Sequence, residues 1–146
     1  NSGMQDIENQ SLATEKPVLS LVGDKLNQLA DEYAASHPGE CSPFGAVVGC
    51  TEEEDARKIR DMYPNVFFLI PGFGAQGGKA RIAATLLDKA GGTVNSSRGI
   101  LTAWKKDEDL AAKRDAGTLT MEDIVAAATK AAKESTEVLL EAKNSL

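Results

Sequence analysis

Short apolar runs alternate along the chain with stretches in which apolar residues recur every three or four positions. Three runs, at 44–50, 66–70 and 93–95, are bounded by polar, glycine or proline residues and are short enough to be buried parallel strands. The stretches around them have the spacing of helices with one buried face. Connections this short allow parallel strands joined by right-handed crossovers. The pattern therefore predicts an α/β fold of about three βα units, with a helix before the first strand.

Local signals place the helix ends. A separate apolar run at 18–22 precedes Gly23-Asp24, which we expect to cap the first helix. Thr51 and Glu54 have the spacing of a capping box for the second helix. Thr120 is expected to cap a long final helix.

Two further segments are mostly polar. Residues 104–118 are highly charged, and we expect them to wrap the surface. Residues 1–17 are polar and predict a loop. The first methionine, Met4, lies inside this loop, so we expect the chain to be a fragment or a processed piece of a longer protein.

Two turns that follow predicted strands have the chemistry of an anion site. Segment 71–78 reads PGFGAQGG, and its glycines allow the backbone to approach a ligand closely before the next helix begins. Segment 95–99 reads NSSRG and adds hydroxyls and a guanidinium. The carboxyl ends of neighbouring parallel strands share one edge of a sheet, so these turns suggest one shared dianion. This arrangement is typical of a phosphate site in a barrel.

Composition narrows the functional classes. A chain of 146 residues with 42% apolar content can form the core of a single domain, and its net charge of −6 argues against binding to nucleic acid. No apolar stretch approaches the roughly 18 to 20 residues of a membrane span, and no signal segment is visible. We expect a soluble, cytoplasmic protein.

The sequence gives little support for a metal site or for a Ser-His-Asp catalytic triad. Cys41 and Cys50 are the only cysteines and His37 is the only histidine, and their spacing matches no zinc site. We expect both thiols to be reduced and His37 to cap a helix or face solvent. No metal site and no cofactor is predicted.

The sequence of motifs resembles the C-terminal portion of the orotidine 5′-monophosphate (OMP) decarboxylase family, in its longer bacterial branch. The resemblance rests on 71–78 and 95–99, in the order of that family's last two barrel strands, and on FGAVVGCT at 44–51, which resembles its sixth strand. It implies the C-terminal part of a (β/α)₈ TIM barrel over residues 1–146. Residues 1–17 would be a loop, and 18–146 would be βα units with a final helix.

The resemblance also implies which residues hold the substrate phosphate. Gln76 and Arg98 match the family's phosphate ligands, with Gly77, Ser97 and Gly99 completing the predicted site. Backbone N–H groups at 97–99 would contribute to it. Asn95 and Ser96 are weaker candidates, because residues at a strand end often cap the next turn.

The catalytic groups implied by the family are not found in this sequence. The resemblance implies catalysis by lysine and aspartate in an Asp-x-Lys-x-x-Asp motif, without metal or organic cofactor, and the chain lacks this motif. Lys113-Arg114-Asp115 resembles this motif only superficially and is interpreted as part of the surface. We therefore predict no catalytic residue in this chain and no activity from the chain alone.

Three βα units cannot close a barrel, so the strand edges and sheet faces need cover. In order of preference, earlier strands have been removed, a second chain supplies them, or the three units form an open sheet. The implied partners are a nucleotide monophosphate substrate, the missing N-terminal half in the same or a second chain, and a second copy in a homodimer. The alternatives are another phosphosugar-binding TIM-barrel enzyme and a non-catalytic half-barrel that associates with itself.

Overall fold

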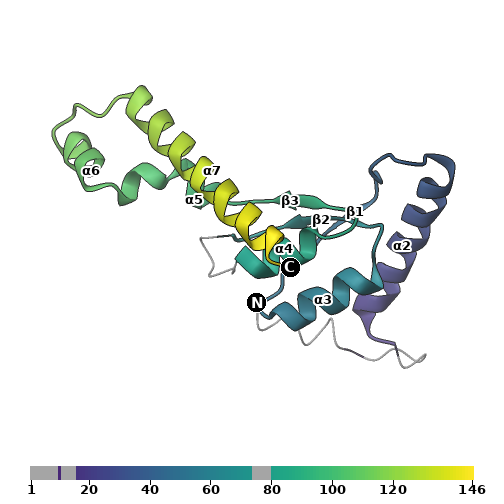
Figure 1. Cartoon of the computed structure of the whole chain (residues 1–146). Coiled ribbons are helices and arrows are strands. Elements are labelled where there is room, and N and C mark those ends of the chain that lie inside the picture. Colours follow the sequence, from purple (N-terminus) through teal and green to yellow (C-terminus); the bar gives the residue numbers. More distant parts are fainter. Residues whose placement is uncertain (1–9, 11–15, 74–79) are drawn as a thin grey trace.

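The computed structural model describes residue 10 and residues 16–73 and 80–146 of the chain. Helices and strands alternate from α2 to α5, and further helices follow (Figure 1). The elements are α2 (Val18–Ser36), β1 (Gly45–Val47), α3 (Glu53–Met62), β2 (Phe67–Ile70), α4 (Ala80–Leu87), β3 (Gly92–Val94), α5 (Ser97–Leu101), the 3₁₀ helix η1 (Ala103–Lys106), α6 (Glu108–Asp115) and α7 (Met121–Asn144). The loop expected at 1–17 lies almost wholly outside the described residues.

The three strands form one parallel sheet in the order β1-β2-β3. Leu69 at its centre lies beside Val47 on one side and Thr93 on the other. Because the strands run in the same direction, their carboxyl ends lie at one edge of the sheet. This confirms the prediction of three parallel βα units and brings the starts of both predicted phosphate turns to that edge.

Only one face of the sheet is covered in the described part of the chain. Helices α3 and α4 lie along it (Figure 1), and Phe68 and Ile70 are buried there. On the opposite face Val47 is 70% exposed and Thr93 is also exposed. The expectation of a strand over 44–50 buried on both faces is therefore wrong for β1, which is shorter and has cover on one face only.

Arg60 of α3 is fully buried at the amino edge of the sheet. Its guanidinium donates hydrogen bonds of 2.6–3.1 Å to four backbone carbonyls, and it lies 3.7 Å from the centre of the Phe68 ring. Burial lowers the pKa of Arg60 to about 10, so the side chain remains charged at neutral pH. The accepting carbonyls belong to Tyr63, Val66, Leu86 and Gly91.

These four carbonyls lie where helices end and strands begin, and carbonyls at such points lack partners in regular secondary structure. A buried carbonyl without a hydrogen bond costs free energy. Arg60 therefore satisfies the polar groups at the ends of α3 and α4 and at the starts of β2 and β3 with a single side chain.

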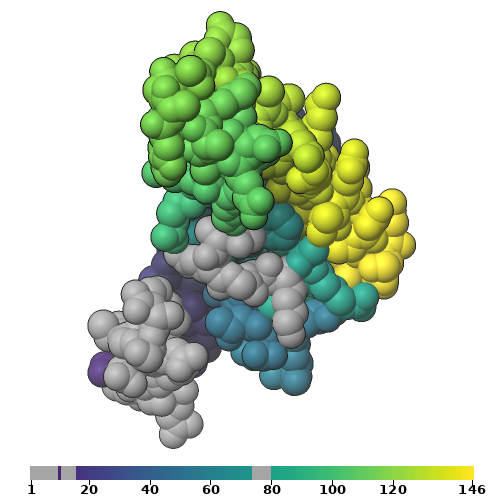
Figure 2. All heavy atoms as spheres, turned by 90° about the vertical axis from the view of Figure 1, so that its left-hand side faces the viewer, coloured from purple at the N-terminus to yellow at the C-terminus, as the bar shows by residue number. Residues whose placement is uncertain are grey.

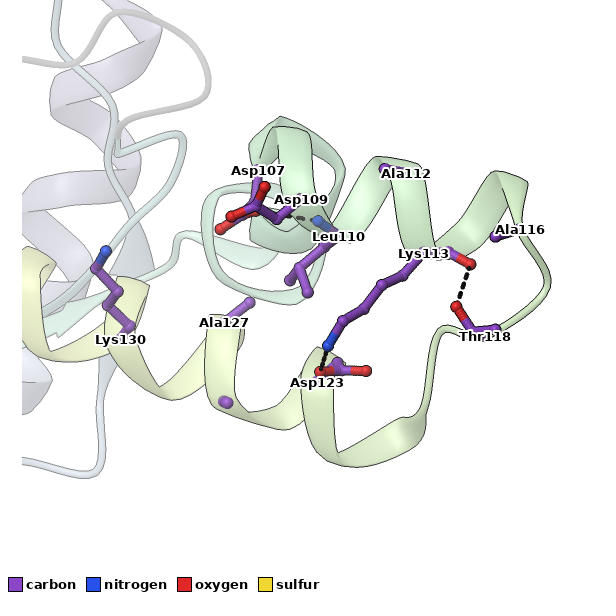
Figure 3. A pocket seen from close by; sticks show the side chains of 11 residues that line it. Asp107, Asp109, Leu110, Ala112, Lys113, Ala116, Thr118, Asp123, Ala127 and Lys130 are labelled. Carbon is purple, nitrogen blue, oxygen red and sulfur yellow. Dashed lines mark hydrogen bonds and ion pairs between the residues drawn. The ribbon is translucent and has the colours of Figure 1, made fainter.

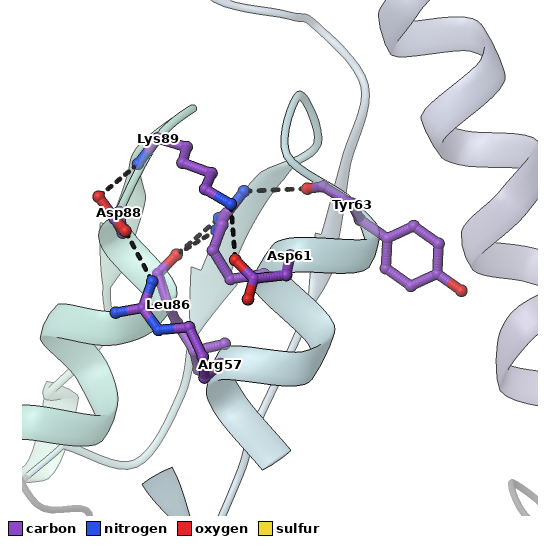
Figure 4. Close-up of polar contacts among 7 residues, drawn as sticks. Arg57, Asp61, Tyr63, Leu86, Asp88 and Lys89 are labelled. Atoms are coloured by element: carbon purple, nitrogen blue, oxygen red, sulfur yellow. Dashed lines mark hydrogen bonds and ion pairs between the residues drawn. The ribbon is translucent and has the colours of Figure 1, made fainter. Parts of the chain in front are cut away.

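Three ion pairs join α3 to α4 and to the turn after it. Their members on α3 lie four residues apart and so share one side of the helix. All are partly exposed, so each adds little stability, but together they hold the two helices in register. The pairs are Glu53–Arg81 (2.6 Å), Arg57–Asp88 (2.7 Å) and Asp61–Lys89 (2.6 Å), of which Figure 4 shows the last two.

Two predicted helix starts are wrong. Helix α2 begins at Val18, so the run 18–22 belongs to it and Gly23-Asp24 lies inside the helix. A glycine suits this position because the Tyr63 ring occupies the space that a Cβ would need. Helix α3 has Glu52 at its N-cap, one residue later than a box formed by Thr51 requires, and it has no side-chain cap bond.

The predicted cap of the last helix is confirmed. The N–H of Asp123 donates to Thr120 Oγ1 over 3.2 Å, and the N–H of Thr120 donates to Asp123 Oδ2 over 3.1 Å. Segment 104–118, expected to wrap the surface, is mostly exposed and contains the end of η1 and helix α6. The Lys113-Arg114-Asp115 sequence lies on the exposed α6, as predicted.

Helix α6 and the first part of α7 project from the sheet as one lobe (Figures 1 and 2). No residue of either helix is fully buried. Lys113 of α6 donates to Asp123 of α7 over 2.7 Å, which links the lobe's two helices. None of the described helices is long and apolar enough to cross a lipid bilayer.

We predict that Arg60→Met lowers the free energy of unfolding by about 3–5 kcal/mol, because it leaves several buried carbonyls without a donor. Arg60→Lys should recover only part of this, since an ammonium cannot reach the same set of carbonyls. Urea unfolding measures both. Arg57→Met on the same helix is the matched control, with an expected loss below about 1 kcal/mol. Equal losses at positions 57 and 60 would contradict this account.

We predict an acid-sensitive contribution from Asp123. The hydrogen bond from Lys113, followed by those from Thr120, lowers the pKa of Asp123 to about 2 from its usual 3.8. A carboxylate whose pKa falls on folding stabilises the fold above its unfolded pKa, and this stability is lost as the pH falls through the folded value. Thermal melts followed by circular dichroism should show that Asp123→Asn loses less stability than the parent between pH ~4 and ~2. The exposed Asp115→Asn is the control, and identical pH profiles for parent and Asp123→Asn would refute the prediction.

Candidate functional site: the carboxyl edge of the sheet

The segments that leave β2 and β3 are bonded to each other at the carboxyl edge. The N–H of Asn95 donates to the carbonyl of Ile70 over 2.8 Å, which extends the pairing of the two strands by one step. Beyond it, the hydroxyl of Ser96 donates to the carbonyl of Phe73 over 2.7 Å. These contacts place the start of the glycine-rich turn beside the 95–99 turn.

The 95–99 turn is shaped by its own polar side chains. Asn95 Oδ1 accepts hydrogen bonds from the N–H of Ser97 (3.0 Å) and from its hydroxyl (2.6 Å). The carbonyl of Ser96 accepts from the N–H of Ile100 over 2.9 Å and so begins helix α5. Asparagine often bonds to the backbone two residues further on in this way, which explains the sharp turn from β3 into a helix.

Arg98 is the second residue of α5, and its side chain is exposed at this edge. Among the described residues, none forms a hydrogen bond or an ion pair with its guanidinium. Its backbone carbonyl accepts a hydrogen bond from Thr102 Oγ1 over 2.7 Å, which fixes the helix without using the charged group. The guanidinium therefore remains available to bind an anion.

The other predicted phosphate residues are less directly available to a ligand than Arg98 is. Ser97 is exposed, but its N–H already donates to Asn95, so a ligand would have to compete for it. Gly99 is half-buried, and a Cβ at this position would collide with the Ser96 hydroxyl. Gln76 and Gly77 lie outside the described residues, so their approach to Arg98 remains a prediction.

A hollow of about 520 Å³ opens beside these residues. Phe73, Ser96 and Gly99 contribute to its lining. Two lysines and two acidic residues also line it, so the hollow carries no excess of positive charge; they are Lys106, Lys130, Asp107 and Glu134. A larger hollow of about 800 Å³ lies between α6 and α7, where Lys113 reaches across to Asp123 (Figure 3). It belongs to the projecting lobe and not to the strand ends.

His37 and Cys41 lie away from this edge, whereas Cys50 follows the carboxyl end of β1. His37 ends α2, is exposed, and stacks on the Tyr33 ring with centroids 4.1 Å apart, so the prediction of a capping or solvent-facing histidine is confirmed. Cys41 is exposed and forms no disulfide. In the described part of the chain, no three His, Cys, Asp or Glu side chains gather in a way that could hold a metal ion.

The sequence offered Asn95 and Ser96 only as weaker phosphate candidates, because residues at a strand end often cap the next turn. Ser96 does occupy the N-cap position of α5, but its side chain makes no cap bond and reaches Phe73 instead. This contact joins residues 23 positions apart. Only the pairing of β2 with β3 brings them together, so no local pattern could have revealed it.

Comparisons with known proteins show what the chain as a whole is similar to. No protein-family model matches the chain. Curated relatives include the orotidine 5′-phosphate decarboxylase of Clostridium perfringens strain SM101, which is 48% identical over 110 residues. That of Clostridium kluyveri is 46% identical over 112 residues. Each match covers 75% of this chain, whereas the chain spans only 38% and 37% of these two relatives.

A solved structure gives the corresponding result for the fold. A crystal structure described as an orotidine-monophosphate-decarboxylase from Toxoplasma gondii matches with a TM-score of 0.56 and 24% identity. The match covers 91% of this chain and 49% of that one. At this identity the match shows the fold alone, which is part of a TIM barrel.

From the curated relatives and the shared fold together, the chain is homologous to part of the orotidine 5′-phosphate decarboxylases, which are lyases of pyrimidine biosynthesis.

Proposed function

We propose that this chain is the C-terminal, phosphate-binding portion of an enzyme that converts OMP to uridine 5′-monophosphate (UMP) and carbon dioxide. The observation that carries the proposal is the exposed Arg98 at the carboxyl edge of the sheet, without a partner among the described residues, in a chain 48% identical to a decarboxylase. Active sites of TIM barrels lie at this edge.

The chemistry of the proposed site suits a phosphate dianion. Arg98 can donate two parallel hydrogen bonds to phosphate oxygens, and the side-chain amide of Gln76 can donate another. Gly77 would leave room for the ligand to approach the backbone. Gly99 would contribute its backbone N–H, because the space beside its Cα is taken by the Ser96 hydroxyl. Ser97 would donate its hydroxyl proton or its N–H to the phosphate in place of the bond that each donates to Asn95.

In this proposal, another part of the protein supplies the groups that break the carbon–carbon bond. The family resemblance assigns catalysis to an Asp-x-Lys-x-x-Asp motif that this sequence does not contain. We therefore propose that these groups come from an N-terminal barrel half, in the same or a second chain, and that the complete enzyme is a homodimer. No cofactor is part of the proposal. Binding energy from the phosphate would help to hold the reacting base in place during decarboxylation.

The uncovered face of the sheet favours a second candidate, a non-catalytic half-barrel that associates with itself. Val47, at the end of the edge strand β1, is 70% exposed on that face, and a second copy could cover it. A different phosphosugar enzyme on the same barrel is a third possibility, because the phosphate site is common to many of them. Tighter binding of UMP than of ribose 5-phosphate would separate the decarboxylase from that alternative.

Decarboxylation of OMP by the purified protein, followed by ultraviolet absorbance, tests the proposal. The chain alone should show no turnover, whereas the same chain supplied with an N-terminal decarboxylase half should turn over OMP. Sedimentation of the chain alone tests the second candidate. A stable homodimer that binds no UMP and stays inactive with the N-terminal half would replace the proposed function with self-association.

We predict that Arg98→Ala weakens UMP binding to the complete enzyme by more than about tenfold, because a charge-assisted bidentate contact is lost. Arg98→Lys should recover only part of the affinity, since lysine cannot make the paired contact. Isothermal titration measures the dissociation constants. Arg114→Ala, at another exposed arginine, is the matched control and should bind UMP as the parent does. An unchanged affinity for Arg98→Ala would remove Arg98 from the site.

A further inference from the structure

The hydroxyl of Ser96 is a buried polar contact between two loops that regular structure does not join. Ser96 is only 8% exposed, although it lies between the exposed residues Asn95 and Ser97. Its Oγ donates to the carbonyl of Phe73 over 2.7 Å. Phe73 lies three residues beyond β2 and is the last described residue before the glycine-rich turn continues. The hydroxyl therefore connects one predicted phosphate-binding turn to the other.

The surroundings of Ser96 leave its hydroxyl little freedom. A Cβ at position 99 would collide with Ser96 Oγ, so a glycine there preserves the space that the hydroxyl occupies. The backbone of Ser96 is fixed at the same time, because its carbonyl accepts from the N–H of Ile100. Gly99 has no positive φ in the structure, so close approach explains the glycine better than backbone conformation does.

Ser96 does not point its hydroxyl at a ligand, since its proton is already donated to Phe73. Arg98 lies only two residues further along the same turn, and its side chain is exposed. The bond from Ser96 therefore fixes the position of Arg98 relative to the segment that leads into the glycine-rich turn. Two donors that are distant in sequence can bind the same phosphate well only when the distance between them is fixed before the phosphate binds.

We propose that Ser96 is a positioning residue for the phosphate of the nucleotide, acting through its hydrogen bond to the Phe73 carbonyl, with Gly99 as the residue that makes room for that bond. This inference rests on the proposed function. It assigns no ligand contact to Ser96. Loss of the bond lets the two turns separate, so the phosphate loses affinity while contacts to the base and ribose remain.

The test compares UMP with uridine, which lacks the phosphate, as ligands of the complete enzyme. Ser96→Ala should weaken UMP binding by about tenfold and leave uridine binding and the melting temperature close to those of the parent. Ser96→Thr keeps the hydroxyl and should recover most of the UMP affinity. Gly99→Ala should reproduce the loss seen with Ser96→Ala, because it displaces the same hydroxyl.

Ser42→Ala is the matched control. The Ser42 hydroxyl also bonds to backbone, at Phe44, but it does so before β1 at the opposite edge of the sheet. This variant should leave the affinities for both ligands unchanged.

Three outcomes would overturn the inference. Equal losses for UMP and uridine in Ser96→Ala would show a general structural role. An unchanged UMP affinity in Ser96→Ala, together with a large loss in Arg98→Ala, would reject the positioning role and keep the phosphate site. Unchanged UMP affinity in both variants would reject this inference and the proposed function together. If Ser96→Ala does not fold, Gly99→Ala decides by the same comparison of ligands.

Discussion

The buried guanidinium of Arg60 is the contact on which the remaining structure depends. It is a cation in the core with no ion pair among the described residues, and it is tolerated because its donors meet backbone carbonyls and its face lies on the Phe68 ring. A buried charge with this many partners fixes their relative positions closely. The starts of β2 and β3 and the end of α4 are therefore held together from one point.

The two edges of the sheet have different tasks. At the amino edge, Arg60 and the α3–α4 ion pairs hold the helices on the sheet. At the carboxyl edge, the polar groups serve the turns, and Arg98 has no partner in the described part of the chain. This separation matches the general behaviour of parallel α/β folds, in which one edge supports stability and the other carries the chemistry. Ser96 belongs to the second edge although its contact is structural.

The sequence was informative for most local signals, although the capping box expected from Thr51 did not form. The alternation of apolar runs with helical spacing predicted three parallel strands, and Thr120 marked the start of α7. It was misleading where a distant residue decides, as at Gly23, which looked like a helix boundary but lies against the Tyr63 ring inside α2.

The roles of Arg60 and Ser96 could not be recognised from the sequence. Arg60 resembles any other charged residue of an amphipathic helix until its carbonyl partners are known. The same holds for Ser96 and Phe73, which meet only across paired strands. The phosphate motifs were recognisable from their residues, but the geometry between Gln76 and Arg98 depends on a turn outside the described residues.

The Arg60 contacts also have a consequence for the order in which the protein is made. The most distant carbonyl that Arg60 reaches is that of Gly91, 31 residues further along the chain. Closing so short a loop costs little chain entropy, and contacts that are local in sequence form quickly. The segment from α3 to the start of β3 can therefore assemble around its arginine on the ribosome before α7 has been synthesised, and it offers the later helices a surface on which to pack.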